Sequence, residues 1–359
     1  MEKKKILYIV ESFGSGVFTF LVDLINALDD EYEIVVAYGE RKETLKNFKD
    51  YFSANVRFIK VENFTRSINI KKDLKALKEV KKIIKDEKPN IIHLHSSKAG
   101  VIGRLAISGR KVKMFYNPHG FSFLKLDDSK LKRVIYWLIE KIITIINPKC
   151  IIIGCSQGEY EEARKLSKKS ICINNGINIE KLNDETKELN ERVIDFKKIK
   201  ICTSGRIGNQ KNPVMFNEIA KKFPNIEFTW IGDGMQKNKL TSPNINITGW
   251  KSRKEVLRIL NDNDIFILTS LWEGLPISLL EAMYMKKVCI VSNAIGNRDV
   301  IQDGVNGYIA NNIDDFIRTI NDLISSRDVV SIKENANKVV INEFNAVDMI
   351  EKYKREYGG

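Results

Sequence analysis

Two glutamates stand out as residues whose type and spacing could do chemistry. Glu273 lies in a Gly- and Pro-containing loop after the apolar run Ile265–Thr269, and Glu281 lies early in a segment with helical periodicity. A strand, a tight loop and a helix N-terminus form an anion site, because backbone N–H groups and the helix dipole favour phosphate there. Ionised carboxylates beside it would accept hydrogen bonds from sugar hydroxyls. The segment therefore indicates a nucleotide-sugar pocket.

Two basic residues, Arg206 and Lys211, follow the apolar run 199–204. A pyrophosphate needs two fixed cations near neighbouring oxygens, and Arg can bind it through a fork while Lys binds as a point charge. An isolated pair of this spacing is more often two solvated charges in a turn. Gly205 before the pair and the glutamates downstream favour a diphosphate site.

A glycine pair, Gly14-Ser15-Gly16, lies between the first expected strand and the first expected helix. Glycine at this point lets the backbone approach a phosphate closely, although the same residues could equally form a turn. The dinucleotide-binding pattern is incomplete, because Phe18 to Phe20 offer no third glycine and no acidic residue is placed for a ribose. This disfavours a dehydrogenase.

The three histidines lie near the ends of two expected strands. His93 and His95 share one strand face, which could seed a metal site, but no third ligand of suitable type and spacing accompanies them. His93 is therefore expected to be a core histidine. No Asp-x-Asp cluster marks a metal site for a diphosphate, so we expect no metal and no cofactor, and activity without a divalent ion.

Four segments occur together in one order: GSG at 14–16, NPHG at 117–120, GRIGNQKN at 205–212 and WEGLPISLLEA at 272–282. Because of these four segments, the chain resembles the retaining glycosyltransferases of family four, which have the GT-B fold. Within that family it is similar to the bacterial capsular and O-antigen polysaccharide transferases. The resemblance runs from residue 5 to about residue 345. One residue departs from the pattern, since Asn212 stands where the family usually has Gly.

The resemblance implies roles for the residues above. Arg206 and Lys211 would hold the donor diphosphate and stabilise its charge, Glu281 would accept from the ribose hydroxyls, and Glu273 and His119 would border the transferred sugar. Loop and helix-start residues would complete the donor site: Gly14, Ser15, Gly16, Gly205, Gly232, Gly234, Lys251, Gly274, Leu275, Pro276 and Ile277. The acceptor phosphate would meet His95, Ser96 and Lys98.

The elements that must position these residues alternate between strand and helix twice along the chain. Apolar runs such as 6–10, 91–95, 199–204 and 265–269 are typical of buried parallel strands, and periodic segments such as 70–86 are typical of helices. The fold class is α/β, and the resemblance implies two doubly wound Rossmann-like domains facing across a cleft. The expected divisions are an acceptor domain 1–180, a linker 181–198, a donor domain 199–340 and a C-terminal helix 341–359 that returns to the first domain.

Composition fits a globular protein with two cores. The chain has 359 residues, 43% hydrophobic and 29% charged, and its five cysteines are scattered, as in a reduced cytosolic protein. The basic then apolar N-terminus has no small-residue cleavage site, so we do not expect a signal peptide. No run of about 18 apolar residues occurs, and any membrane contact is therefore expected to be peripheral.

The positive charge is concentrated in the first half. Residues 1–200 hold 39 Lys+Arg against 27 Asp+Glu, whereas residues 201–359 hold 20 against 19. Such a surface attracts an anionic leaflet, although a lysine-rich genome would give the same excess. The segment Lys132–Ile146 is apolar nearly all round, which is typical of a buried helix but also of a helix in a bilayer interface.

These inferences predict a metal-independent retaining glycosyltransferase. It would move a hexose or N-acetylhexosamine from a UDP-sugar to a polyprenyl-diphosphate-linked glycan in bacterial surface polysaccharide synthesis. Its place would be the cytoplasmic side of the cell membrane, in contact with the anionic surface. Two alternatives stay open: a GT-B enzyme on a soluble substrate, such as a nucleotide-sugar epimerase or soluble-glycan transferase, and a catalytically silent carbohydrate-binding partner. Nucleic acid is not expected as a partner, because no basic and aromatic platform motif is present.

Overall fold

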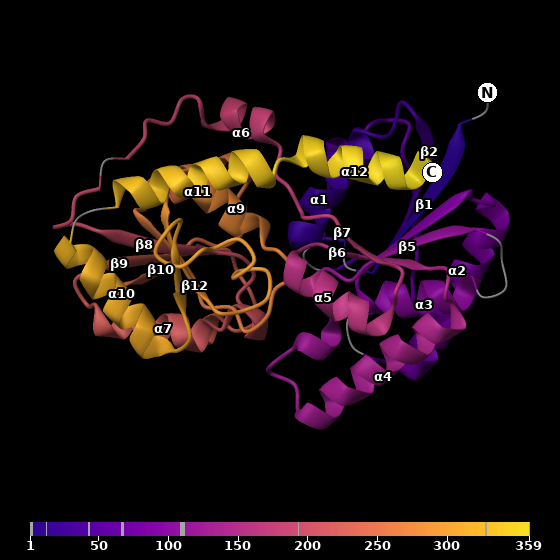
Figure 1. The fold of residues 1–359 in the computed structure, drawn as a ribbon, viewed down its shortest axis with the longest axis horizontal. Coiled ribbons are helices and arrows are strands. Elements are labelled where there is room, and N and C mark those ends of the chain that lie inside the picture. The colour runs from indigo at the N-terminus through magenta and orange to yellow at the C-terminus, as the bar shows by residue number, and fades with distance from the viewer. Residues whose placement is uncertain are drawn as a thin grey trace. The chain divides into compact units, whose positions relative to one another are not determined.

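The computed structural model describes residues 3–11, 13–41, 44–65, 68–107, 112–192, 194–326 and 329–358. The chain forms two compact units (Figure 1): unit 1 comprises residues 1–175 and 348–359, and unit 2 comprises residues 176–347. The chain thus enters unit 2 a few residues before the predicted limit at 180. It returns to unit 1 at residue 348.

Unit 1 is built on a seven-stranded parallel sheet with the strand order β3-β2-β1-β4-β5-β6-β7. The order reverses between β1 and β4, whose last residues Val10 and His95 are paired in register, and His95 in turn pairs with Asn117. At such a reversal, the loops that follow the two neighbouring strands run in opposite directions and leave a crevice outside the strand ends. Open α/β sheets bind ligands in this crevice. The strands are β1 Lys4–Val10, β2 Tyr32–Tyr38, β3 Arg57–Lys60, β4 Ile91–His95, β5 Lys113–Asn117, β6 Ile151–Gly154 and β7 Ser170–Cys172.

Helices cover both faces of this sheet because successive strand side chains point to opposite faces. Leu7, Ile92 and Leu94 belong to one hydrophobic cluster with residues of α2 and α3, whereas Tyr8 and His93 face the C-terminal helix. The helices of unit 1 are α1 Ser15–Asn26, α2 Ile70–Glu87, α3 Ser97–Ile107, α4 Lys130–Ile146, α5 Gln157–Leu166 and α12 Ala346–Gly358, whose first two residues belong to unit 2.

Unit 2 is built on a six-stranded parallel sheet with the order β10-β9-β8-β11-β12-β13. Here the order reverses between β8 and β11. The strands are β8 Lys200–Ser204, β9 Glu227–Ile231, β10 Ile245–Ile247, β11 Ile265–Leu268, β12 Val288–Ser292 and β13 Tyr308–Ala310. The helices are α6 Ile179–Thr186, α7 Pro213–Lys222, α8 Arg253–Asn261, α9 Ile277–Tyr284, α10 Ile313–Ser326 and α11 Val330–Glu343.

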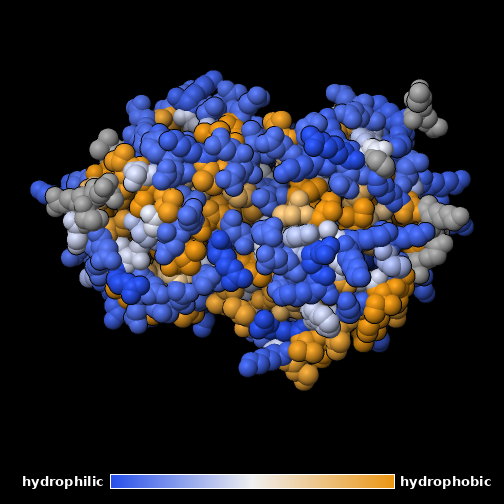
Figure 2. Space-filling model, in the orientation of Figure 1, coloured by the Kyte–Doolittle hydropathy of each residue, from blue (hydrophilic) through white to orange (hydrophobic). Residues whose placement is uncertain are grey.

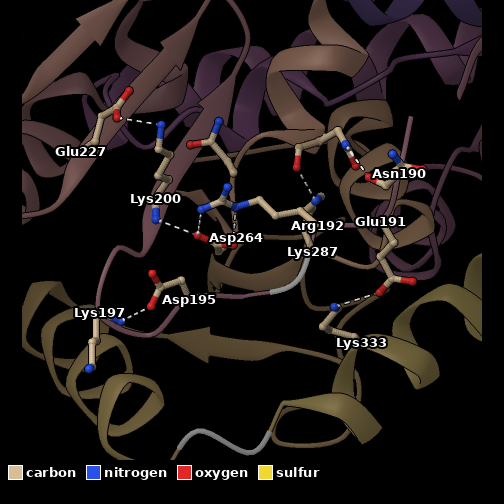
Figure 3. Close-up of polar contacts among 12 residues, drawn as sticks. Asn190, Glu191, Arg192, Asp195, Lys197, Lys200, Glu227, Asp264, Lys287 and Lys333 are labelled. Carbon is tan, nitrogen blue, oxygen red and sulfur yellow. Dashed lines mark hydrogen bonds and ion pairs between the residues drawn. The ribbon is translucent and has the colours of Figure 1, made fainter. Parts of the chain in front are cut away.

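The segment predicted as a linker is attached to unit 2 by ion pairs (Figure 3). Arg192 Nε lies 2.7 Å from Asp264 Oδ1, and Asp264 also accepts a hydrogen bond from the backbone N–H of Lys200 at 2.9 Å. Glu191 lies 3.0 Å from Lys333 Nζ. Residues 179–186, which overlap the start of this stretch, form helix α6, and the Asn178 side chain caps its first turn.

The C-terminal stretch expected as one helix is interrupted. Helix α11 ends at Glu343, and α12 begins at Ala346. Between them, Ile177 N–H donates to Phe344 O at 2.9 Å and Ala346 N–H donates to Ile177 O at 2.9 Å. Residues 341–343 thus belong to the end of α11, and the C-terminal helix begins at Ala346 and lies in unit 1 from residue 348 onward.

The predicted fold class is confirmed: both units are doubly wound parallel α/β sheets. All five cysteines carry free thiols, and four of them are buried. In the described part of the chain, no helix combines the length and apolar character needed to cross a membrane.

Candidate active site

The predicted donor-binding residues of unit 2 gather at the carboxyl edge of its sheet. Gly205 follows β8 and Gly232 follows β9, and parallel strands end at one edge. The Gly205 N–H donates to Ile231 O, and the Ile207 N–H donates to Asp233 O, each at 2.9 Å. The loops after β8 and β9 therefore lie backbone to backbone.

The glycines in these loops are required by that contact. Gly205 and Gly232 have φ of +137° and +140°, a region that residues with a Cβ rarely adopt. A Cβ on Gly232 would lie 2.3 Å from Gly205 O, and one on Gly234 would lie 2.2 Å from Ile207 O. Loop packing alone thus accounts for these glycines, whatever ligand they meet.

Lys211 and Glu273 are brought together although 62 positions separate them. Lys211 Nζ lies 2.8 Å from Glu273 Oε1, and both side chains are largely buried. Lys211 ends the short 3-10 turn Asn209–Lys211, and the Thr269 hydroxyl donates to its carbonyl at 2.7 Å. Gln210, which the sequence motifs did not single out, donates from Nε2 to Glu273 Oε2 at 3.1 Å.

One oxygen of Glu273 has a single neighbour of opposite charge. Its Oε1 is buried and is paired with Lys211, and among the described residues it accepts from no other group. A carboxylate oxygen has two lone pairs, so Oε1 retains the capacity to accept one more hydrogen bond.

Arg206 lies half-buried in the same loop as Lys211, between β8 and α7. The loop ends at Asn212, whose φ of 49° is left-handed, and its side chain accepts a hydrogen bond from Met215 N–H at 3.3 Å. Asn is the residue other than Gly that best tolerates this conformation. Asn212 can therefore adopt the backbone conformation that the family's glycine would adopt, and its side chain caps α7.

Glu281 is paired with Arg253, a residue that sequence reasoning missed. Arg253 Nη1 contacts Glu281 Oε1, and Arg253 Nε lies 3.2 Å from Glu185 Oε2 on α6. Burial alone lowers the pKa of Arg253, but the two carboxylates raise it above its ordinary value. The ribose-binding role expected for Glu281 would thus be carried out beside a fixed guanidinium.

The other predicted donor residues of unit 2 lie just before α9 and α8 or at the first residue of α9. Pro276 is the N-cap of α9, and Leu275 and Ile277 beside it are buried. A Cβ on Gly296 would lie 2.1 Å from Gly274 O, so the loops after β11 and β12 also touch. Lys251 precedes α8, and its Nζ lies 3.3 Å from Glu255 Oε1. Glu255 also forms the capping box of α8 with Ser252.

In unit 1 the structure brings His95 and His119 together at the ends of β4 and β5. His95 Nδ1 lies 3.0 Å from His119 Nε2, and the rings are stacked at 5.3 Å. His119 has a left-handed φ of 51°, and His95 Nε2 is buried without a hydrogen-bond partner in the described chain. His95 is completely buried, whereas His119 is partly exposed.

His93 is a satisfied core histidine, as expected. Its Nε2 lies 2.6 Å from Asn117 Oδ1 and its Nδ1 lies 2.5 Å from the Tyr357 hydroxyl. Asn117 Oδ1 can only accept, so Nε2 carries the proton and Nδ1 accepts from Tyr357. Asn117 Nδ2 donates in turn to the Tyr353 hydroxyl at 2.9 Å. Helix α12 is thereby tied to the end of β4 and β5.

The predicted acceptor residues are partly engaged within unit 1. Lys98 Nζ lies 2.8 Å from Asp73 Oδ1, and the Ser96 hydroxyl lies 3.5 Å from Glu11 Oε2 at the end of β1. Glu11 is buried and pairs with Arg41, and neither residue was singled out from the sequence. A carboxylate followed by Arg at the ends of two neighbouring strands is a signal that sequence reading could have used.

The glycine pair of unit 1 lies at the start of α1. Gly14 is the N-cap of this helix and has an extended φ of −178°, so no left-handed conformation requires glycine there. Gly16 is exposed on the first turn, and Ser15 opens the helix between them. Among the described residues, no cluster of three or more His, Cys, Asp or Glu side chains is placed to hold a metal ion.

Burial keeps the histidines of unit 1 neutral. It lowers the pKa of His93 to about 3, that of His119 to about 4, and that of His95 well below its ordinary value. The unfolded chain binds protons at these rings below pH of about 6.5, whereas the folded chain does not. Stability contributed by the neutral rings is therefore full above pH of about 6.5 and is lost as the pH falls toward the folded pKa values.

We expect the free energy of unfolding of unit 1 to fall by about 2 kcal/mol per buried histidine between pH 6.5 and 5. Urea unfolding followed at both pH values measures this. In the His119→Asn variant, asparagine tolerates the left-handed backbone of this position, and its amide does not titrate in this pH range. It should show a pH dependence smaller by about 2 kcal/mol. An unchanged pH dependence would mean that His119 is protonated in the folded state.

Two protein-family models match this chain. Residues 14–181 match the family described as Glycosyltransferase Family 4, and residues 184–339 match Glycosyl transferases group 1. The Escherichia coli enzyme named UDP-Gal:alpha-D-GlcNAc-diphosphoundecaprenol alpha-1,3-galactosyltransferase is 32% identical over 337 residues, which cover 86% of this chain and 85% of the relative. The chain belongs to the family-four glycosyltransferases.

Solved structures show the same fold. Sucrose-phosphate synthase from Thermosynechococcus elongatus matches with a TM-score of 0.82 at 14% identity, covering 99% of this chain and 98% of that one. Anabaena Alr3699/HepE in complex with UDP and glucose matches with a TM-score of 0.76 at 15% identity, covering 99% of each chain. This glycosyltransferase therefore has the GT-B fold predicted from its motifs.

Proposed function

We propose that this glycosyltransferase is a retaining, metal-independent enzyme. It moves a hexose or N-acetylhexosamine from a UDP-sugar to a polyprenyl-diphosphate-linked glycan in bacterial surface polysaccharide synthesis. Its place is the cytoplasmic face of the cell membrane, with which it associates peripherally. The observation that carries the reaction is the largely buried pair Lys211–Glu273, in which a fixed cation and a carboxylate oxygen with remaining acceptor capacity lie 2.8 Å apart.

The donor assignment is supported by the residues at the edge of the unit 2 sheet. Arg206 and Lys211 would bind the diphosphate, Glu281 would accept from the ribose, and Glu273 would accept from the transferred sugar. The E. coli relative is named for a UDP-Gal donor, and the HepE structure contains UDP. Two fixed cations would neutralise the diphosphate without a divalent ion.

The acceptor assignment is supported by the same relative, which is named for a diphosphoundecaprenol acceptor. The first half of the chain holds the excess of Lys and Arg, which favours an anionic acceptor at an anionic surface. His119 at the end of β5 would border the transferred sugar. His95, Ser96 and Lys98 would lie near the acceptor phosphate, with Lys98 exchanging Asp73 for it.

The residues support a front-face mechanism. The acceptor hydroxyl attacks the anomeric carbon on the side that the UDP leaves, the glycosidic bond to the diphosphate breaks, and the leaving phosphate takes the hydroxyl proton. Arg206 and Lys211 stabilise the charge that develops on the diphosphate. Glu273 orients Lys211 and the sugar. The product keeps the anomeric configuration of the donor.

Two measurements test this proposal. UDP-, GDP- and dTDP-sugars are screened in EDTA for a rise in melting temperature, since a ligand at one hundred times its Kd adds about 2.7 kcal/mol. A domain of this size should gain about 5–10 °C with the correct donor. Products with that donor are then analysed by mass spectrometry and NMR, using a polyprenyl-diphosphate sugar and the same sugar without lipid.

A lipid-linked product with the donor's anomeric configuration is expected. A donor shift with transfer only to the free sugar would favour a soluble-glycan transferase, and conversion of the donor alone would favour an epimerase. No shift with any donor would favour a silent carbohydrate-binding partner. The Arg206→Ala variant should lose the shift, whereas Lys221→Ala, on an exposed helix end, should keep it.

A further inference from the structure

We propose that Glu11, Arg41 and Ser96 form a binding site for a hydroxyl group of the acceptor sugar. The site lies in unit 1, at the crevice between the ends of β1 and β4. The inference rests on the proposed function, because it takes the acceptor to be a glycan. It adds the groups that recognise the sugar itself, rather than the phosphate or the lipid that carries it.

The three residues come from the ends of three strands of one sheet. Glu11 directly follows β1, Ser96 directly follows β4, and Arg41 lies in the loop after β2. Val10 and His95, which precede Glu11 and Ser96, are partners in register. The site therefore lies where the strand order of this sheet reverses, and open α/β sheets bind ligands at that point.

The loops that carry Glu11 and Arg41 are fixed to each other. The Thr44 hydroxyl accepts from the Arg41 N–H at 3.0 Å and donates to Phe13 O at 2.8 Å. A Cβ on Gly39 would lie 2.6 Å from Glu11 O, so the backbones after β1 and β2 are in contact. The two side chains are thus held in place before a ligand arrives, which lowers the entropic cost of binding.

Glu11 has remaining capacity to accept a hydrogen bond. Its side chain is buried and its Oε1 contacts Arg41 Nη2, whereas the Ser96 hydroxyl lies 3.5 Å from Oε2. Hydrogen bonds between oxygens are normally about 2.5–3.0 Å long, so the contact with Ser96 is weak. A carboxylate oxygen has two lone pairs, and Oε2 can therefore accept a full hydrogen bond from a further donor.

Arg41 has a remaining donor. Its Nε is buried and has no hydrogen-bond partner among the residues that the structure describes, although Nη2 of the same guanidinium pairs with Glu11. Buried N–H groups without an acceptor are rare in folded proteins. An oxygen atom of a bound ligand would satisfy it.

Ser96 has a backbone conformation that favours glycine. Its φ is 82°, in the left-handed region that serine rarely adopts. Residues held in such conformations cluster at binding and active sites, where the surrounding structure maintains the strain. Because glycine would adopt this backbone more readily, the conformation alone does not account for a serine here. The hydroxyl is what the serine side chain contributes.

A sugar hydroxyl matches these three groups because it both donates and accepts. It can donate to Glu11 Oε2 and accept from Arg41 Nε–H or from the Ser96 hydroxyl. A phosphate only accepts and would be repelled by the Glu11 carboxylate, and an ammonium group only donates and would be repelled by Arg41. The Ser96 hydroxyl would then contact the sugar, whereas the adjoining phosphate would meet Lys98.

The recognition at this site is polar. The exposed apolar residues Leu131, Ile142 and Ile145 belong to α4, another part of unit 1, and Figure 2 shows that part as an orange area at the lower right. A hydrocarbon chain is therefore not the ligand expected beside Glu11 and Arg41.

The test is saturation-transfer NMR of the full chain with the methyl α-glycosides of glucose, galactose, GlcNAc and GalNAc. Wild type should bind at least one of them. Glu11→Gln should bind that glycoside about tenfold more weakly, and Ser96→Gly about fivefold, since hydrogen bonds to charged groups contribute more than neutral ones. Ser96→Gly suits the left-handed backbone and should stay folded even where Glu11→Gln, which leaves Arg41 without its anion, does not.

A matched control comes from the opposite edge of the same sheet. Glu33, near the start of β2, also pairs with an arginine, Arg57, and Glu33→Gln should bind the glycoside like wild type. With a lipid-linked acceptor, Glu11→Gln and Ser96→Gly should raise the acceptor KM by about the same factors. Both should keep the rise in melting temperature that the nucleotide-sugar donor causes.

Four results would overturn the proposal: no glycoside bound by wild type, equal binding by wild type and both variants, competition by inorganic phosphate, or loss of the donor shift in the variants. Competition by phosphate would identify an anion site, and loss of the donor shift would identify a donor site. A chain that transfers sugar to lipid but binds no glycoside fails this proposal alone. A chain that binds a glycoside through these residues but shows no donor shift fails the proposed function alone.

Discussion

The Lys211→Met variant is expected to transfer sugar about a thousandfold more slowly than wild type. Removing one fixed group that stabilises developing charge typically costs about 10²–10³ in kcat. Lys211 also neutralises a largely buried carboxylate, since its Nζ lies 2.8 Å from Glu273 Oε1. The loss should appear mainly in kcat, because the stabilised charge develops on the diphosphate as the bond breaks. Steady-state kinetics with the donor found in the screen measure it.

Two further variants separate chemistry from folding. Lys211→Met leaves Glu273 without its cation, whereas Lys211→Met/Glu273→Gln removes the buried charge as well. The double variant should regain stability but not activity. Lys221→Met, which changes a lysine on the exposed end of α7, serves as the control. A kcat for Lys211→Met within threefold of wild type would remove Lys211 from the catalytic set.

The Arg104→Met variant is expected to lower the stability of unit 1 by about 3–5 kcal/mol, because it leaves the buried Glu140 carboxylate unpaired. Both side chains of the pair are almost completely buried. Replacing both, as Arg104→Met/Glu140→Met, should recover most of the loss, since buried pairs often exchange for apolar residues without cost. Urea unfolding of the single and double variants measures the coupling.

The matched control is the exposed pair Lys221–Glu218, in which Lys221→Ala should cost less than about 1 kcal/mol. If Arg104→Met were as mild as this control, water would have to reach Glu140.

Elements dominated by local pattern could be predicted from the sequence. The apolar run Ile91–His95 is β4 to the residue, and α2 begins at Ile70 as its periodicity predicts. Buried parallel strands read as apolar runs, and strongly amphipathic helices as periodic ones, so neighbouring residues suffice to recognise them. The short strand Ile245–Ile247 went unnoticed because three partly polar residues carry no such pattern.

Contacts between distant segments could not be predicted in this way. The motifs named Lys211 and Glu273 separately, but their pairing depends on the order β8-β11 in the sheet. Arg253 was missed because its partner Glu281 lies 28 positions away and is brought near only by the fold of unit 2. The sequence thus allowed the candidate site residues to be named. The hydrogen bonds and ion pairs between them could be identified only from the folded structure.

The polar network around His93 has a consequence for biosynthesis. Tyr353 and Tyr357 contribute hydroxyls to it, yet all of unit 2 is translated between the rest of unit 1 and these two tyrosines. At about 5–20 residues per second, a ribosome needs roughly ten to thirty-five seconds to add that stretch. Unit 2 is continuous and can fold as it emerges, whereas His93 Nδ1 and Asn117 Nδ2 of the first-made unit lack their tyrosine partners until the end of the chain is made. The unit whose synthesis starts first is therefore the last to be completed.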